Sequence, residues 1–206
     1  KTNFDKNFSR KFQFGTRLDE PAGIGYDYDI TMPEEGERMT DTEAMHEALS
    51  LAREAADEGE VPVGCIVTDG EHIVGRGRNR RETGKSALAH AELEAIAEAC
   101  RTLGGWRLWR CTLYVTLEPC PMCAGAIINA RIPRVVFGAP DPKAGSCGSV
   151  TDLFALPYNH RPACEGGVLE EECSQLLRDF FRALRLAPPK PRWKPAVLPA
   201  QGGDHA

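Results

Sequence analysis

The sequence contains no run of eighteen apolar residues and no signal-peptide pattern at its start. A membrane-spanning helix needs about 20 consecutive apolar residues, and a signal peptide needs a basic stretch before a shorter apolar one. These absences predict a soluble, cytoplasmic protein with no membrane partner. The 206 residues are 42% hydrophobic. This content suffices for one core of ordinary size, so we expect a single domain with extensions.

Positive charge is in deficit, because the net charge of the chain is −5. A negative balance by itself argues against a nucleic-acid partner. The charge is unevenly distributed, however: residues 19–60 hold fourteen acidic and two basic side chains, whereas residues 61–206 hold fifteen acidic and eighteen basic ones. The acid is thus concentrated near the start of the chain, and a basic surface farther along remains compatible with a nucleic acid.

The sequence has one C-x-x-C pair, formed by Cys120 and Cys123, and His90 lies thirty residues upstream. Two thiolates and an imidazole make three ligands for Zn²⁺ and leave the fourth tetrahedral position for water, as in catalytic zinc sites. Glu92 follows His90 by two residues. It is well placed to take a proton from that water without binding the metal, and to return the proton to a leaving group.

A structural zinc site and a redox-active C-x-x-C are the alternatives. A redox pair leaves His90 and Glu92 unexplained, and the prolines on both sides of Cys120 suit a helix start whose dipole favours thiolate. A structural site usually has a fourth Cys or His at ligand spacing. No second C-x-x-C exists among the remaining cysteines, which we expect to be free thiols in a reducing compartment: Cys65, Cys100, Cys111, Cys147, Cys164 and Cys173.

Periodicity predicts an alternation of helices and strands. Helices are expected at 40–59, 90–103, 121–130 and 170–185, and strands at 63–68, 72–77, 112–116, 133–138 and 165–169. Thr40 and Glu43 fit a capping box, and Asp69-Gly70 predicts a hairpin. The order predicts a three-layer α/β/α domain around a mixed five-stranded sheet. The apolar stripes of the second and last helices comprise Leu93, Ile96, Ala97, Cys100 and Leu103, and Cys173, Leu176, Leu177, Phe180, Phe181 and Leu184.

Three regions are expected along the chain. Residues 1–38 lack a sustained period and predict a poorly ordered N-terminal extension. Residues 39–186 form the zinc-dependent catalytic domain. Residues 187–206 contain repeated prolines and several basic residues, which predict a disordered tail.

H-x-E followed by P-C-x-x-C resembles the signature of zinc-dependent nucleobase deaminases. Over about residues 40–186 the chain is similar to the bacterial tRNA adenosine deaminases. The segments that carry this likeness are Glu60–Gly64, His90–Glu92, Tyr114–Cys120, Met122–Ile127, Val136–Ala139, Asp141–Lys143 with Gly145, and Asn159–Arg161. The resemblance implies a cytidine deaminase-like fold, one Zn²⁺ per subunit and a homodimer. It also implies hydrolytic conversion of adenosine to inosine at the wobble position of an arginine tRNA anticodon.

The same resemblance implies contacts with the anticodon stem-loop. Asn79 would meet the flipped adenine, Pro62 and Val63 would wall its pocket, and Asp141 and Asn159 would hold flanking nucleotides. A basic run precedes His90, and we hypothesise that it contacts phosphate; the alternative is a solvated face. Its members are Arg76, Arg78, Arg80, Arg81 and Lys85, and a second basic group that could reach the stem comprises Arg182, Arg185, Lys190, Arg192 and Lys194.

Two other functions stay open at this point. Pro121 within the C-x-x-C is shared with guanine deaminases, so a free nucleobase or nucleoside is an alternative substrate for the same zinc chemistry. Such an enzyme would not need the basic run. A zinc-binding RNA module without catalysis is the other alternative, and it would leave Glu92 without a role.

Overall fold

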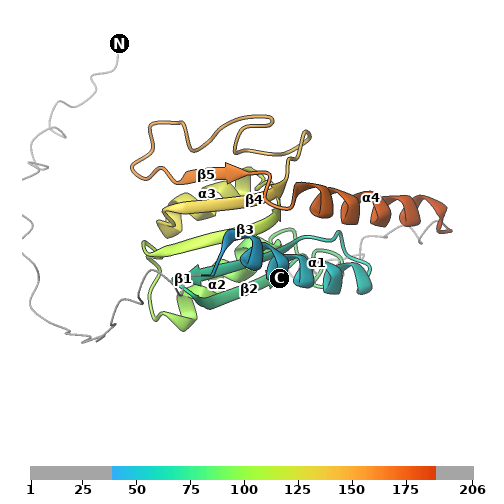
Figure 1. Ribbon diagram of the computed structural model, residues 1–206, viewed down its shortest axis with the longest axis horizontal. Coiled ribbons are helices and arrows are strands. Elements are labelled where there is room, and N and C mark those ends of the chain that lie inside the picture. The colour runs from blue at the N-terminus through green and yellow to red at the C-terminus, as the bar shows by residue number, and fades with distance from the viewer. Residues whose placement is uncertain (1–38, 189–206) are drawn as a thin grey trace, which may run out of the picture. The chain divides into compact units, whose positions relative to one another are not determined.

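The protein is described by a computed structural model, in which residues 39–188 are placed (Figure 1). The predictions for residues 1–38, and for all but the first two residues of the tail at 187–206, lie outside this range. The elements are α1 (Asp41–Asp57), β1 (Gly64–Asp69), β2 (His72–Arg78), α2 (Ala91–Thr102), β3 (Cys111–Leu117), α3 (Pro121–Ala130), β4 (Arg134–Ala139), β5 (Ala163–Gly166) and α4 (Glu170–Leu186).

The five strands form one mixed sheet in the order β2-β1-β3-β4-β5. β1 runs antiparallel to β2 and β3, whereas β3, β4 and β5 are parallel. The predicted mixed five-stranded sheet is therefore confirmed. The last strand begins at Ala163, two residues before the predicted start, and it ends at Gly166 because Gly167 adopts a φ of 95°.

Helices cover both faces of the sheet, which confirms the three-layer α/β/α architecture (Figure 1). Residues of α1 and α4 share one buried cluster, whose largest side chains include Met45 and Leu49. Residues of α2 and α3 share the other cluster, which contains Leu113 and Ile127. The capping box predicted at Thr40 is present, with the Glu43 amide donating to the Thr40 hydroxyl at 3.2 Å.

The face that α2 buries differs from the predicted stripe. Ala91, Ala95 and Ala99 are fully buried against β2. A Cβ atom at Gly75 or Gly77 would collide with the backbone of the helix. Small side chains on both elements therefore let α2 lie directly on the strand, and the backbone contact replaces the packing of large side chains.

The apolar stripes predicted for α2 and α4 were wrong at several positions, which are exposed or only partly buried. Ala97 on α2 is exposed, Leu103 is 36% exposed, and Ile96 and Cys100 are only partly buried. On α4, Phe181 and Leu184 are exposed, and Cys173 is the buried residue of that helix. Periodicity identifies the apolar side of a helix, but it does not show how far the helix extends beyond the sheet that covers it.

The topology brings the segments that follow several elements to one end of the sheet. β3 and β4 are parallel, so the segments that follow Leu117 and Ala139 both leave the sheet at the C-terminal ends of these strands. The segment after β3 leads through Pro119 to the start of α3. Within residues 39–188, the structure shows no helix with the length and apolar content that crossing a bilayer would require.

Candidate metal centre and catalytic site

The side chains of His90, Cys120 and Cys123 meet where α2 and α3 begin. Nδ1 of His90 lies 3.7 Å from Sγ of Cys120 and 3.6 Å from Sγ of Cys123. The three ligand atoms all lie within 4.8 Å of one another. Sulfur and nitrogen ligands at the corners of a zinc tetrahedron are about 3.5 Å apart. The donor separations therefore fit Zn²⁺, although other divalent metals accept similar ligands.

Local sequence explains why these side chains lie at helix starts. His90 is the N-cap of α2 and Cys120 is the N-cap of α3, and both have extended backbone angles. Pro121 occupies the first helical turn, where its missing N–H costs nothing. Two helix N-termini thus point their positive ends at the same cluster, which stabilises negative charge on the sulfur atoms.

A hydrogen bond between the Cys120 and Cys123 side chains moves the pKa values of the two thiols in opposite directions. A hydrogen bond from the Cys123 thiol lowers the pKa of Cys120 to about 4, and the same bond raises the pKa of Cys123 well above its usual value. The hydrogen bond with Cys120 likewise raises the pKa of His90. A cation that binds both sulfur atoms as thiolates would displace the proton of the hydrogen bond between them, which is the behaviour expected of zinc ligands.

Glu92 lies in the first turn of α2, beside this cluster. Its side chain is buried, and burial raises its pKa to about 6. The negative charge of Cys120 raises the pKa further, while hydrogen bonds from the Glu92 backbone and from Cys123 oppose the shift. A buried carboxyl group that titrates near neutral pH can both accept and donate a proton.

Asn79 follows β2 directly and is buried next to the turn that contains Pro62 and Val63. Its backbone N–H donates to the Val63 carbonyl at 2.9 Å, and its side-chain Nδ2 donates to the Val61 carbonyl at 3.2 Å. The structure therefore brings together three of the predicted substrate residues, since Pro62 lies between the two carbonyls. The bond from Nδ2 to Val61 fixes the orientation of the amide, so Oδ1 of Asn79 can accept a hydrogen bond from a ligand.

A second buried carboxylate, that of Glu60, is hydrogen-bonded to the segment that follows Asn79. Glu60 is 1% exposed and accepts hydrogen bonds from the backbone N–H groups of Glu82 and Thr83 at 3.2 and 2.6 Å. It joins the turn before β1 to the segment between Asn79 and His90. Sequence analysis gave Glu60 no role beyond its place in the family resemblance; the available signal was a charged residue directly before the apolar residues that precede β1.

Asp141 lies in the segment that follows β4, at the same edge of the sheet as Cys120. Its backbone N–H donates to Glu118 Oε2 at 3.0 Å, and its Oδ1 accepts from the Lys143 N–H at 2.9 Å. Glu118 precedes Cys120 by two residues. Sequence analysis gave Glu118 no role beyond its place in the family resemblance.

The structure does not bring Asn159 to the metal cluster. His160, its neighbour, has Nε2 at 2.7 Å from the Ile132 carbonyl, and the Ala163 N–H donates to the Pro133 carbonyl. Both carbonyls precede β4, so this segment lies near the N-terminal end of β4, at the opposite end of the sheet from the C-terminal ends of β3 and β4. The role assigned to Asn159 in RNA binding stays a prediction.

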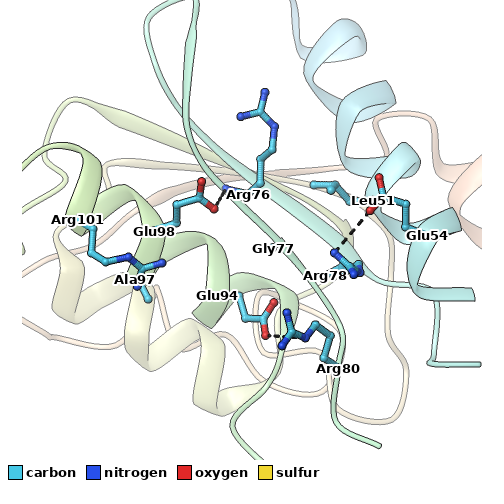
Figure 2. A pocket seen from close by; sticks show the side chains of 10 residues that line it. All are labelled: Leu51, Glu54, Arg76, Gly77, Arg78, Arg80, Glu94, Ala97, Glu98 and Arg101. Carbon is cyan, nitrogen blue, oxygen red and sulfur yellow. Dashed lines mark hydrogen bonds and ion pairs between the residues drawn. The ribbon is translucent and has the colours of Figure 1, made fainter. Parts of the chain in front are cut away.

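Three members of the basic run, Arg76, Arg78 and Arg80, line a cavity of ≈ 630 Å³ beside α1 and α2 (Figure 2). Several of its charges are already paired. Arg78 contacts Glu58 at 2.6 Å, and Arg80 lies 3.6 Å from Glu94. Figure 2 shows Arg78 directed toward α1 and Arg80 toward α2. The cavity contains no member of the metal cluster, so it is separate from the candidate catalytic site.

Arg81 and Lys85 differ from these neighbours. Both are exposed, and neither takes part in an ion pair within residues 39–188. The Glu60 carboxyl and the His90 imidazole both experience the charge of Arg81. The charge of Arg81 therefore acts on one of the metal-ligand side chains. The phosphate hypothesis is therefore strongest for Arg81 and Lys85.

Comparisons with known proteins agree with this geometry. The profile of the MafB19-like deaminase family matches residues 39–185. A tRNA-specific adenosine deaminase of Bacillus subtilis is 50% identical over 142 residues, which are 68% of this chain and 88% of that protein. A solved structure from work on A-to-I editing by tRNA:A34 deaminases is 42% identical with a TM-score of 0.64, covering 66% of this chain and 99% of the other.

Guanine deaminases are more distant. The structure of the Nitrosomonas europaea guanine deaminase is 22% identical, with a TM-score of 0.57 and coverage of 68% of this chain and 84% of the other. Identity at that level shows a common fold and nothing more. The tRNA deaminases named above are more identical to this chain, which covers most of the length of each. The chain therefore belongs to the tRNA-specific adenosine deaminases, a family within the cytidine deaminase superfamily.

Proposed function

We propose that the protein deaminates adenosine to inosine at the wobble position of a tRNA anticodon, with an arginine tRNA as the expected substrate. The observation that carries the proposal is the buried Glu92 carboxyl beside three zinc-compatible ligands, in a chain that belongs to the tRNA-specific adenosine deaminases. Water adds to C6 of adenine and the amino group leaves as ammonia.

His90, Cys120 and Cys123 would hold one Zn²⁺ per subunit. When bound, the ion acts as a Lewis acid that makes water a nucleophile near neutral pH. Glu92 takes a proton from the attacking water and delivers it to the departing amino group. Asn79 directs Oδ1 toward the adenine, and the turn at Pro62 and Val63 walls the base. These residues provide orientation and proton transfer around the buried Glu92 carboxyl.

The test uses the purified, zinc-loaded protein with an anticodon stem-loop that carries adenosine at the wobble position. A parallel reaction contains free guanine, and inosine and ammonia are measured in both. We expect inosine in the RNA and no ammonia from guanine. Turnover of guanine with inert RNA would instead establish a free-base deaminase, and the basic run would then be a solvated face.

We further propose that the protein acts as a homodimer in the cytoplasm. Support for the dimer comes from the family resemblance, and support for the location comes from the proposed tRNA substrate. Sedimentation of the protein with and without the stem-loop would measure the oligomeric state. A monomer that deaminates the RNA at full rate would exclude a required dimer.

Charge neutralisation at Arg81 should weaken RNA binding and reduce its salt dependence. An exposed cation that contacts phosphate releases about one counterion, so Arg81→Gln should make the negative slope of log K against log salt shallower by about 1. Lys85→Gln should have the same effect. The measurement is a titration of the labelled stem-loop at several salt concentrations.

Arg78→Gln is the matched control, because Arg78 is already paired with Glu58 and Glu54. Its salt slope should equal that of the unmodified protein. If the slope is the same for Arg81→Gln as well, the exposed cations of this segment face only solvent.

A further inference from the structure

The carboxylate of Glu118 accepts several hydrogen bonds from the segment that follows β4. The backbone N–H groups of Asp141, Cys147 and Ser149 donate to it at 3.0, 2.9 and 3.0 Å, and the Ser149 hydroxyl donates as well. Glu118 itself is 2% exposed. Three backbone donors that span nine residues thus converge on one carboxylate.

The segment also closes tightly against the chain on either side of Glu118. The Ser146 N–H donates to the Pro119 carbonyl at 2.9 Å, and the Glu118 N–H donates to the Ala139 carbonyl at 2.9 Å. A Cβ atom at Gly145 would collide with the Glu118 carboxyl group. The approach is therefore so close that Gly145 cannot carry a side chain without displacing either the carboxylate or the loop.

Burial of this carboxylate is compensated by hydrogen bonds rather than by a cation. No Lys or Arg within residues 39–188 forms an ion pair with Glu118. Hydrogen bonds to a charged acceptor are stronger than neutral ones. Another loop conformation would leave a buried charge without its donors, which is costly.

We propose that Glu118 is a positioning residue for RNA binding: it holds the 140–150 segment in the shape that presents Asp141 beside the metal ligand Cys120. The role follows from its position, since one side chain fixes Asp141 through its backbone and lies two residues from Cys120 in the chain. This inference rests on the proposed function, because Asp141 meets RNA only if RNA is the substrate.

The test compares Glu118→Gln with the unmodified protein, both loaded with zinc. Glutamine keeps the size, but only one of its terminal atoms can accept, and its NH₂ group would face N–H donors. We expect one zinc per chain, faster hydrogen exchange at the Asp141, Cys147 and Ser149 amides, and a KM for the stem-loop raised about tenfold or more. The kcat should change much less. A merely structural role would lower the folded fraction without changing KM.

Two further variants keep the test decisive if Glu118→Gln folds poorly. Ser149→Ala removes one donor and should raise KM in the same direction by a smaller factor. Thr151→Ala removes an exposed hydroxyl directly after the 140–150 segment that is not among the donors to Glu118 described above, and it should leave KM unchanged. If Glu118→Gln folds and its KM for the stem-loop is unchanged, the proposal is overturned, whether or not hydrogen exchange at the three amides becomes faster.

Failure of the proposed function gives a different result. If the unmodified protein neither binds nor deaminates the stem-loop, the RNA role of Asp141 and hence of Glu118 is excluded. Hydrogen exchange would still show whether Glu118 orders the segment. The two failures are therefore distinguishable in one set of samples.

Discussion

Glu92→Gln is expected to reduce kcat for the stem-loop by about 10³-fold, because general acid–base catalysis contributes about 10²- to 10⁴-fold. The amide has nearly the same size as the carboxyl, so packing in the first turn of α2 should survive. It cannot accept the proton of the attacking water or deliver it to the amino group. Zinc content and RNA affinity should stay at the values of the unmodified protein, since Glu92 is proposed as a proton carrier and not as a ligand.

Glu94→Gln is the matched control for this substitution. Glu94 lies two residues along the same helix, is half-buried, and pairs with Arg80 rather than with the metal cluster. Its kcat should be unchanged. The informative measurements are zinc per chain, stem-loop affinity and single-turnover rate on the same preparations. Turnover by Glu92→Gln at the normal rate would exclude the proposed proton transfer.

The metal ligands and Glu92 could be proposed from the sequence because short-range spacing carries that information. A histidine and a C-x-x-C pair at predicted helix starts need only one contact between α2 and α3 to form a site. The capping box at Thr40 and the hairpin at Asp69-Gly70 were predictable for the same reason, since they depend on neighbouring residues. Five strands alternating with helices then indicated the three-layer fold.

Contacts between distant backbone segments could not be predicted in this way. Glu118 and Asp141 are twenty-three residues apart, and their bond exists because β3 and β4 are parallel and end at the same edge of the sheet. The pairing of Arg78 with Glu58 depends likewise on how α1 lies against β2. A basic run therefore shows that charge is present, but the fold decides which charges remain available to a ligand.

The placement of His160 illustrates the same limit. Strand order sets its Nε2 against the Ile132 carbonyl, before β4, a contact that no local pattern indicates. The RNA contact that the family resemblance implies for the neighbouring Asn159 stays a prediction. The depth of the apolar faces on α2 and α4 was unpredictable for a related reason, because it depends on the extent of the sheet beneath each helix.

Cys120→Ala is expected to abolish both zinc binding and deamination. It removes one of three ligands and also the hydrogen-bond partner of Cys123. Bound zinc should fall from one per chain to a small fraction, with affinity lowered by more than about 100-fold. Because metal binding and folding are linked, the unfolding midpoint should fall as well. Metal analysis, circular dichroism and urea unfolding measure these changes.

Cys164→Ala is the control, since Cys164 is an exposed cysteine on β5 and lies outside the metal cluster. It should retain zinc, stability and turnover. Chelation of the unmodified protein should reproduce the loss seen in Cys120→Ala, and added Zn²⁺ should restore only the chelated protein. Stoichiometric zinc in active Cys120→Ala would exclude this ligand set. Together with Glu92→Gln, which should be inactive with its metal in place, the variant separates metal binding from proton transfer.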